Sequence, residues 1–274
     1  MKIKRNLYVA ALLLGLTTTA YSQHASAAYT SNDSILACKI IQSDLQSPAD
    51  AGKTLKGLPY VAHTLEGNKQ EQLIINLREL DCTTFVENCI ALYKSKGKDF
   101  NYYLHELQSL RYFNGVINGY SSRKHYMTSW INDNVSNGLI TDLTQKDGTA
   151  SLKTNLQFMS AHSYKYEYLM ENKDSIPHIR QVEKKYSNIT IKYLPKEELI
   201  PAGLPWIKDG DIIAILTTIK GLDVSHVGIA VYVNGELHLL HASSAAKKVI
   251  VDSRPLSVQI NKPNCQGIRV LRVN

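Results

Sequence analysis

Five short β-rich segments near the C-terminus constrain the fold more than any other feature of this 274-residue chain. They span residues 211–218, 226–233, 236–242, 248–252 and 267–273. The Asn234-Gly235 dipeptide between the second and third is a strong hairpin signal, because both residues adopt the positive φ of a tight turn. The segments before them have helical periodicity. Helices followed by an antiparallel sheet predict an α+β fold.

Several helices are expected in the first two thirds of the chain. Apolar residues recur about one helical turn apart in segments 32–45, 82–93, 100–113 and 152–173, and a shorter helix is expected to end near residue 138. Segment 60–64 is expected to be extended and segment 114–122 to be a loop. No break divides the chain, so residues 28–274 are expected to form a single domain.

The helix expected to begin at Cys82 carries Phe85, Val86 and Cys89 on one apolar stripe. Asp81 directly before it can act as an N-cap, which places Cys82 in the first turn. There the unpaired backbone N–H groups and the helix dipole favour a thiolate and can also bind an oxyanion. The alternative is that a cysteine on an apolar face is a small core residue, and this interpretation suits Cys89.

Strand alternation separates two neighbouring histidines in segment 236–242. His241 shares a face with Leu237 and Leu239, so it is expected to point toward an apolar interior. His238 lies on the opposite face and is expected to point toward solvent.

His226 lies on the other strand of the expected hairpin. It shares its face with Gly228 and Ala230, which are small enough to let a helix pack close against the sheet. If the Cys82 helix docks there, Cys82, His226 and His241 supply the nucleophile, base and orienting group of thiol catalysis. The alternative is two hydrogen-bonded histidines in a structural hairpin.

The first 27 residues have the form of a secretory signal peptide. Lys2, Lys4 and Arg5 precede a short apolar run at 7–16, and small residues at 20–22 or 25–27 offer cleavage sites. The run is too short to span a membrane. The mature protein is therefore expected to be secreted or periplasmic, without a membrane anchor; a buried N-terminal helix is the alternative.

Charge and cysteine content set weaker limits on the possible partners, cofactors and disulfides. Without the three leader bases the net charge falls from +7 to +4, and no long basic run or nucleic-acid motif is present. Neither Cys-x-x-Cys nor His-Glu-x-x-His spacing occurs, so no metal or cofactor is expected. With Cys82 as nucleophile, at most one disulfide can form; Cys38 with Cys265 is favoured, although the connectivity stays open. A monomer is expected.

Five short motifs resemble those of a known enzyme family. In order, they are Gly57-Leu58-Pro59-Tyr60, Asp81-Cys82-Thr83-Thr84-Phe85-Val86, Gly210-Asp211, Ser225-His226-Val227-Gly228-Ile229 and His241-Ala242. Together they resemble the NlpC-type cell-wall cysteine peptidases, a papain-like family that cuts amide bonds in peptidoglycan. The resemblance covers about residues 57–92 and 208–252. It implies that Cys82 is the nucleophile, His226 the base and His241 the third member.

Two departures indicate a particular branch of that family. Thr83-Thr84 replaces Ser-Gly after the cysteine, and a mainly helical insertion of about residues 94–207 separates the helix from the sheet. The chain is similar to a secreted branch first catalogued as a domain of unknown function. That branch implies an N-acetylmuramoyl-L-alanine amidase acting on muropeptides, with a 1,6-anhydro sugar expected. The residues expected to contact substrate are Tyr60, Asp81, Thr83, Thr84, Arg123, His125, Tyr126, Trp130 and Ser225.

Three alternatives remain open from the sequence. The four expected contacts within the insertion can equally be packing residues. An endopeptidase of the same fold would cut after γ-D-glutamate and leave the sugar–peptide bond intact. A non-catalytic wall-binding protein, or one with a Cys/His zinc site, is the remaining interpretation.

Overall fold

The computed structural model describes residues 27–66 and 70–274, so nearly all of the expected signal peptide lies outside the described residues. The α-helices are α1 (Ser31–Ile41), α2 (Pro48–Thr54), α3 (Cys82–Lys94), α4 (Phe100–Arg111), α5 (Met127–Ser136), α6 (Thr144–Asp147), α7 (Phe158–Ala161), α8 (Glu167–Glu171), α9 (Ile176–Tyr186) and α10 (Leu256–Gln259). The strands are β1 (Ile140–Asp142), β2 (Ala150–Lys153), β3 (Thr190–Pro195), β4 (Ile212–Thr217), β5 (Val224–Val233), β6 (Glu236–Ser243), β7 (Lys248–Val251) and β8 (Cys265–Val273). Short 3₁₀ turns lie between them. Within the described ranges, no helix is both long and apolar enough to cross a membrane.

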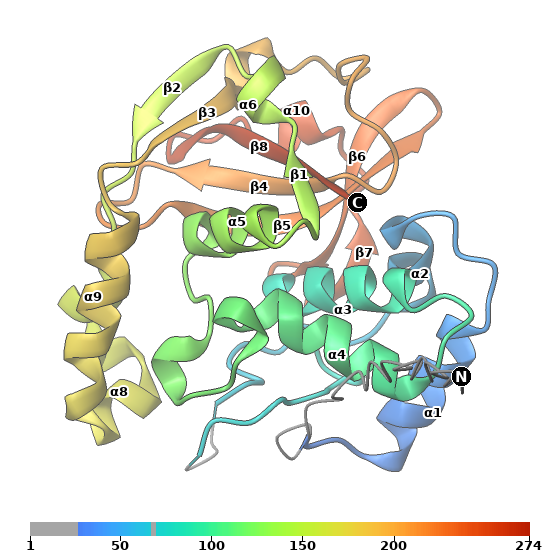
Figure 1. Cartoon of the computed structure of the whole chain (residues 1–274). Coiled ribbons are helices and arrows are strands. Elements are labelled where there is room, and N and C mark those ends of the chain that lie inside the picture. The colour runs from blue at the N-terminus through green and yellow to red at the C-terminus, as the bar shows by residue number, and fades with distance from the viewer. Residues whose placement is uncertain (1–26, 67–69) are drawn as a thin grey trace, which may run out of the picture.

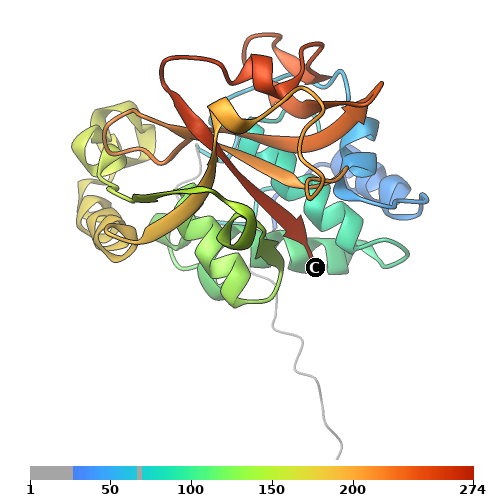
Figure 2. The same cartoon turned by 90° about the horizontal axis from the view of Figure 1, so that it is seen from above.

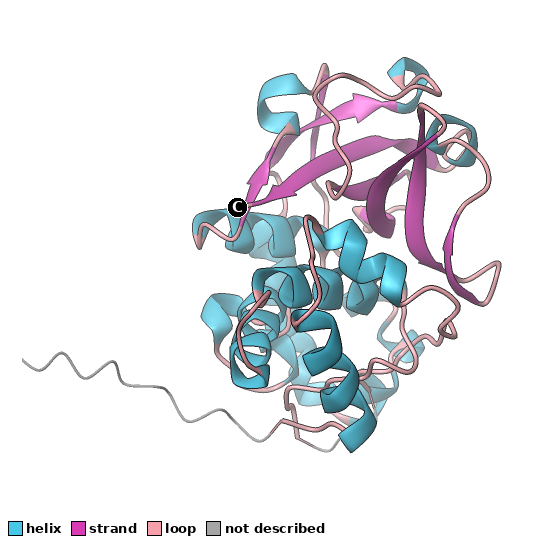
Figure 3. Cartoon of the chain, turned by 90° about the vertical axis from the view of Figure 1, so that its right-hand side faces the viewer, coloured by secondary structure: helices cyan, strands magenta, loops and turns pink. Residues whose placement is uncertain are grey.

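The molecule has a helical layer and an antiparallel sheet, which confirms the expected α+β fold (Figures 1 and 3). The strand order is β2-β3-β8-β4-β5-β6-β7, and β1 pairs with β8 beside this path. All five expected strands are present. Asn234 and Gly235 form the turn between β5 and β6 with φ values of 51° and 83°, as the hairpin signal predicts.

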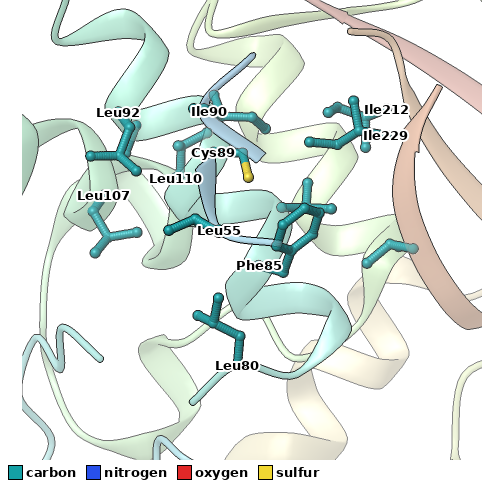
Figure 4. Packing of buried hydrophobic residues seen from close by; sticks show 14 of the residues in the cluster. Leu55, Leu80, Phe85, Cys89, Ile90, Leu92, Leu107, Leu110, Ile212 and Ile229 are labelled. Carbon is teal, nitrogen blue, oxygen red and sulfur yellow. The ribbon is translucent and has the colours of Figure 1, made fainter. Parts of the chain in front are cut away.

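The first core lies between the helices and one face of the sheet. Phe85, Cys89 and Ile90 of α3 pack toward Ile212 and Ile229 of the sheet (Figure 4). This burial confirms the structural interpretation of Cys89.

A glycine lets α2 approach this core closely. A Cβ atom on Gly52 would lie 2.9 Å from side-chain atoms of both Leu240 and Phe85. Any side chain there would push α2 away from the sheet and from α3.

A second core covers the opposite face of the same strands. Leu237 and Leu239 of β6 belong to it, together with Ala230 of β5 and Leu256 of α10. The sheet is therefore buried on both faces at β4 and β6, and β4 reads as a nearly continuous apolar run.

This double burial corrects the expected docking of the nucleophile helix. Helix α3 packs on the face that carries Val227 and Ile229, not on the face of Gly228. A Cβ atom on Gly228 would lie 2.7 Å from Leu239 and 3.0 Å from His241 Cβ. Gly228 therefore makes room for the neighbouring strand rather than for the helix.

The insertion is less helical than expected. Helices α4 and α5 match their predicted segments, but the long helix expected over 152–173 is wrong. Strand β2 pairs with β3 there, with Leu152 opposite Ile191, and only the short α7 and α8 follow. Strand pairing between distant segments overrode the local helical pattern. The insertion also supplies β1 and β3, which both pair with β8.

Two further boundaries differ from the expectation. Helix α1 ends at Ile41, and α2 begins separately at Pro48 because Ser47 and Asp50 form a new capping box. The segment expected to be extended from Tyr60 turns after residue 61. Helices α8 and α9 lie at the end of the molecule opposite α1 and α2 (Figures 1 and 2).

Candidate active site

Helix α3 begins at Cys82 with the predicted cap. The Asp81 carboxylate accepts a hydrogen bond from Thr84 N–H at 2.8 Å, and Thr84 Oγ1 accepts one from Asp81 N–H at 2.9 Å. This capping box fixes Cys82 in the first turn. Among the described residues, the backbone N–H groups of Cys82 and Thr83 donate to no backbone or side-chain oxygen. Two donors at the positive end of α3 are therefore available to an oxyanion.

The Cys82 thiol is protonated in the resting structure. Burial raises the pKa of Cys82 to about 11, and the charge of Asp81 adds to this, while hydrogen bonds from the Val227 backbone and the Thr83 side chain lower it. The helix end is expected to favour a thiolate, but burial has the larger effect and leaves the pKa of Cys82 above its ordinary value. The bond with Val227 nevertheless places the thiol against β5, next to His226 in the sequence.

His226 and His241 form a hydrogen-bonded pair across the hairpin. His226 Nε2 lies 2.6 Å from His241 Nδ1, and the two rings are perpendicular with centroids 4.8 Å apart. Burial lowers the pKa of His226 to about 3, and the neighbouring His241 and Lys262 lower it further. Burial also lowers the pKa of His241 to about 4, although the Asp252 charge raises it. Both rings are therefore neutral at pH 7, which a general base requires.

The remaining ring nitrogen of His226 is unused. His226 Nδ1 has no hydrogen-bond partner in the described part of the chain, and no direct bond joins it to the Cys82 thiol there. Catalytic hydrogen bonds in ligand-free enzymes are often long and tighten when substrate binds. The Cys82 thiol thus contacts β5 at the Val227 backbone, whereas His226 and His241 are bonded to each other directly.

His238 differs from the expectation. It is buried with 5% of its surface exposed, and its Nδ1 lies 2.8 Å from the carbonyl oxygen of Asp252. Strand parity assigned it correctly to the face opposite His241, but that face is also covered. Alternation therefore does not imply solvent exposure in this sheet.

Two further expected contacts lie near the nucleophile or the base. The pKa of Tyr60 is raised by burial and by the nearby Cys82 and Asp81, and its ring packs on the first core. Ser225 is exposed and directly precedes His226, at a β-bulge in the pairing of β4 with β5. Bulges of this kind re-aim side chains beside active sites.

Arg123 and Tyr126 lie inside the protein, not at this site. Arg123 forms ion pairs with Glu66 at 2.9 Å and Glu71 at 2.8 Å. The Tyr126 hydroxyl donates to Glu183 at 2.7 Å. Both side chains are at most 8% exposed as residues, and these bonds use their polar atoms.

His125 and Trp130 are also occupied within the insertion. His125 Nε2 lies 2.8 Å from the carbonyl oxygen of Tyr120, and Trp130 Nε1 donates to Glu87 at 3.2 Å. The structure brings none of the four insertion residues into contact with the thiol or the histidine pair. Their contacts are those of packing residues.

Sequence reasoning missed two buried carboxylates. Asp252 Oδ2 lies 4.0 Å from His241 Nε2, and Glu87 joins Arg111 to Trp130 beneath α3. Asp252 stands at the end of an expected strand, where no local pattern marks it. Glu87 could have been noticed as an acid within the apolar nucleophile helix.

The cysteines and the potential metal ligands were also compared with the expectations from the sequence. All four cysteines are free thiols, so the expected Cys38–Cys265 disulfide is not formed: Cys38 is exposed on α1 and Cys265 is buried in β8. In residues 27–66 and 70–274, no group of three or more His, Cys, Asp or Glu side chains is arranged to hold a metal ion.

A capped helix-end cysteine and a neutral histidine pair on the adjacent hairpin are the residue types that thiol-dependent acyl transfer uses. Residues 50–268 match the AmiA-like family, described as N-acetylmuramoyl-L-alanine amidase-like. The chain belongs to this family, since the match spans most of its length. No curated protein matches the sequence significantly.

Solved structures agree with this assignment. An N-acetylmuramoyl-L-alanine amidase from Bacteroides uniformis is 41% identical, with a TM-score of 0.80, covering 83% of this chain and 99% of its own. A Bacteroides fragilis protein described provisionally as a xylanase is 44% identical, with a TM-score of 0.79, covering 81% and 98%. A Legionella pneumophila protein of family DUF1460 is 22% identical with a TM-score of 0.65, covering 89% and 93%, and shares the fold.

Proposed function

We propose that this protein is a cysteine amidase that hydrolyses the bond between N-acetylmuramic acid and L-alanine in peptidoglycan fragments. The observation that carries the proposal is the hydrogen bond between His241 of β6 and His226 of β5, the strand whose Val227 backbone contacts the Cys82 thiol. The 41% identity to an amidase from Bacteroides uniformis supports the choice of substrate. The core would then correspond to the papain-like arrangement of the NlpC-type enzymes.

Acylation begins with removal of the thiol proton. Because the pKa of Cys82 is raised, His226 Nδ1 takes this proton as Sγ attacks the lactyl carbonyl carbon. The carbonyl π bond opens to an oxyanion, which the N–H groups of Cys82 and Thr83 stabilise. The oxyanion then collapses, the C–N bond breaks, and the L-alanine nitrogen takes the proton from His226. The product is a thioester on Cys82 and a free stem peptide.

Deacylation uses the same groups in reverse. His226 accepts a proton from water as the water oxygen attacks the thioester carbonyl. The C–S bond breaks, the thiol regains the proton, and the muramic acid leaves as a carboxylic acid. Two easier steps thereby replace direct hydrolysis of an amide.

The substrate orientation distinguishes this amidase from its nearest alternative. The sugar occupies the acyl side of Cys82, beside Thr83-Thr84, and fragments with a 1,6-anhydro sugar are the proposed substrates. An endopeptidase would place γ-D-glutamate there instead. A xylanase requires two carboxylates about 5–10 Å apart across the scissile bond, whereas the groups proposed here are a thiol and two imidazoles.

The proposed setting is outside the cytoplasm, because residues 1–27 have the pattern of a leader. The mature enzyme is proposed to act there as a monomer, in the periplasm or after secretion.

Product analysis of one defined muropeptide tests the proposal. Mass spectrometry should find intact sugar and an intact stem peptide with a free L-alanine amine. Sugar still joined to L-Ala–γ-D-Glu, with a shortened peptide released, would establish the endopeptidase instead. EDTA should leave the rate unchanged; a loss that zinc restores would favour a metal mechanism.

A further inference from the structure

We propose that Asp252 is a positioning residue that sets the tautomers of His241 and, through it, of His226. The inference rests on the proposed roles of Cys82, His226 and His241. It adds a fourth member to that set, from the segment that follows β7.

The Asp252 carboxylate is held firmly in place. Its Oδ1 accepts hydrogen bonds from Arg254 N at 3.0 Å and Nε at 3.1 Å, and its Oδ2 accepts one from Arg254 Nη2 at 2.9 Å. Its backbone is tied to β6, because Asp252 N–H donates to Leu239 O at 2.9 Å and His238 Nδ1 donates to Asp252 O at 2.8 Å. Burial raises the pKa of Asp252, but the bonds from Arg254 outweigh it and leave the pKa below its ordinary value. The group is therefore an anion at neutral pH.

His241 Nε2 faces this anion without any other partner. The nitrogen is buried, has no hydrogen-bond partner in the described residues, and lies 4.0 Å from Asp252 Oδ2. That separation exceeds a direct hydrogen bond, so the coupling is electrostatic. An N–H pointing at a carboxylate is favoured there over a lone pair, and this places the proton of neutral His241 on Nε2.

The tautomer of His241 then decides that of His226. With its proton on Nε2, His241 has an acceptor at Nδ1, and the 2.6 Å contact requires His226 Nε2 to donate. Neutral His226 consequently has a lone pair at Nδ1, where the thiol proton must be received. The opposite tautomer would put a proton on His226 Nδ1 and block the base. The protons that move during catalysis pass through His226 Nδ1, and Asp252 stays ionised throughout.

Charged groups around the histidine pair shift its pKa in opposite directions. The charged groups that act on it are Asp252 and Arg254 after β7, and Lys262 before β8. Asp252 raises the pKa of His241, whereas Arg254 and Lys262 lower it. Removing the anion should therefore lower the pKa of the pair, and removing a cation should raise it.

Alkylation of Cys82 by iodoacetamide tests the inference without a muropeptide. The rate is followed against pH by peptide mass mapping, so that exposed Cys38 does not interfere. Asp252→Asn, which keeps the shape and removes the charge, should slow alkylation roughly tenfold at neutral pH, a part of the total effect of a general base. It should also move the acid limb of the profile to lower pH.

Arg254→Gln is the matched variant, because its side chain is 54% exposed and its loss should not unfold the protein. It should move the same limb to higher pH. An unchanged rate and limb in folded Asp252→Asn would overturn the inference, as would an unchanged limb in Arg254→Gln if Asp252→Asn fails to fold. The test is independent of which bond the enzyme cuts, so failure of the amidase proposal on muropeptides would leave its outcome standing.

Discussion

The histidine pair and the insertion residues expected to contact substrate differ in how their polar atoms are partnered. At the site, His241 Nε2, His226 Nδ1 and the first N–H groups of α3 have no protein partners among the described residues. In the insertion, Arg123 is paired twice, and Tyr126 both donates to Glu183 and accepts from Met159 N–H. His226 Nδ1 and the helix-end N–H groups therefore remain available to a substrate, whereas the polar atoms of Arg123 and Tyr126 are used within the protein.

The insertion supports the core from behind the nucleophile helix. Glu87 of α3 accepts hydrogen bonds from Arg111 Nε at 2.7 Å and Trp130 Nε1 at 3.2 Å. The insertion thus joins α4 and α5 to the helix that carries Cys82. Its aromatic and basic residues stabilise the position of the thiol without contacting it.

The largest expected effect is that of Cys82→Ala. Loss of the nucleophile should reduce muropeptide hydrolysis by at least about 10³-fold. The melting temperature should hardly change, because a partly exposed first-turn thiol contributes little packing. Cys38→Ser, at an exposed cysteine, is the control and should keep full activity. Substantial turnover by Cys82→Ala would remove Cys82 from the mechanism.

A smaller loss is expected for His241→Ala. Without its orienting partner, His226 should lose about 10²-fold in kcat. His238→Ala removes a buried hydrogen bond to Asp252 O and should chiefly cost stability, about 1–3 kcal/mol. Steady-state kinetics with denaturant unfolding separates the two effects. Equal losses of kcat in both variants would contradict the assignment of His241.

Arg123→Met should reduce stability strongly and activity little, the reverse of what is expected for His241→Ala. It removes the cation between two largely buried carboxylates, Glu66 and Glu71, so the free energy of unfolding should fall by about 3 kcal/mol. Activity per folded molecule should stay near that of the wild type. Arg180→Met, at an exposed position of α9, is the control. A large rise in KM with unchanged stability would instead make Arg123 a substrate contact.

The smallest expected effect is that of His125→Asn, which should change the pH dependence of stability but not that of activity. Burial lowers the pKa of His125 to about 3, and the Arg123 charge lowers it further, so the unfolded chain binds more protons than the native state between about pH 6.5 and that value. Stability should therefore fall as pH drops through this window. His125→Asn should remove about 1 kcal/mol of the fall between neutral and mildly acidic pH. Its pH–rate profile should match the wild type; a shifted profile would place His125 at the site.

Local patterns predicted the parts of the fold that local chemistry decides. The Asn234-Gly235 turn, the Asp81 cap and the five C-terminal strands follow from short-range preferences. The helix expected over 152–173 failed because β2 gains more from pairing with β3 than its periodicity could reveal. The solvent-facing assignment of His238 failed because the first core, which includes Leu240 and Ala242 on the same face, covers it.

The site was predictable only in part, for a related reason. Strand parity brought His226 and His241 together, because a hairpin fixes which residues are neighbours. Asp252 reaches His241 through the pairing of β7 with β6, which no short motif marks. The protonation state of the Cys82 thiol depends on how deeply the folded chain buries it. The position of Cys82 at a helix end does not reveal this burial.

Trapping the acyl-enzyme tests the central claim most directly. Wild-type protein mixed with a defined muropeptide is quenched in acid, and the peptide that contains Cys82 is examined by mass spectrometry. The account predicts a thioester whose added mass is that of the sugar with its lactyl group. An adduct that also contains L-Ala–γ-D-Glu, or efficient turnover through an intermediate on another residue, would contradict it.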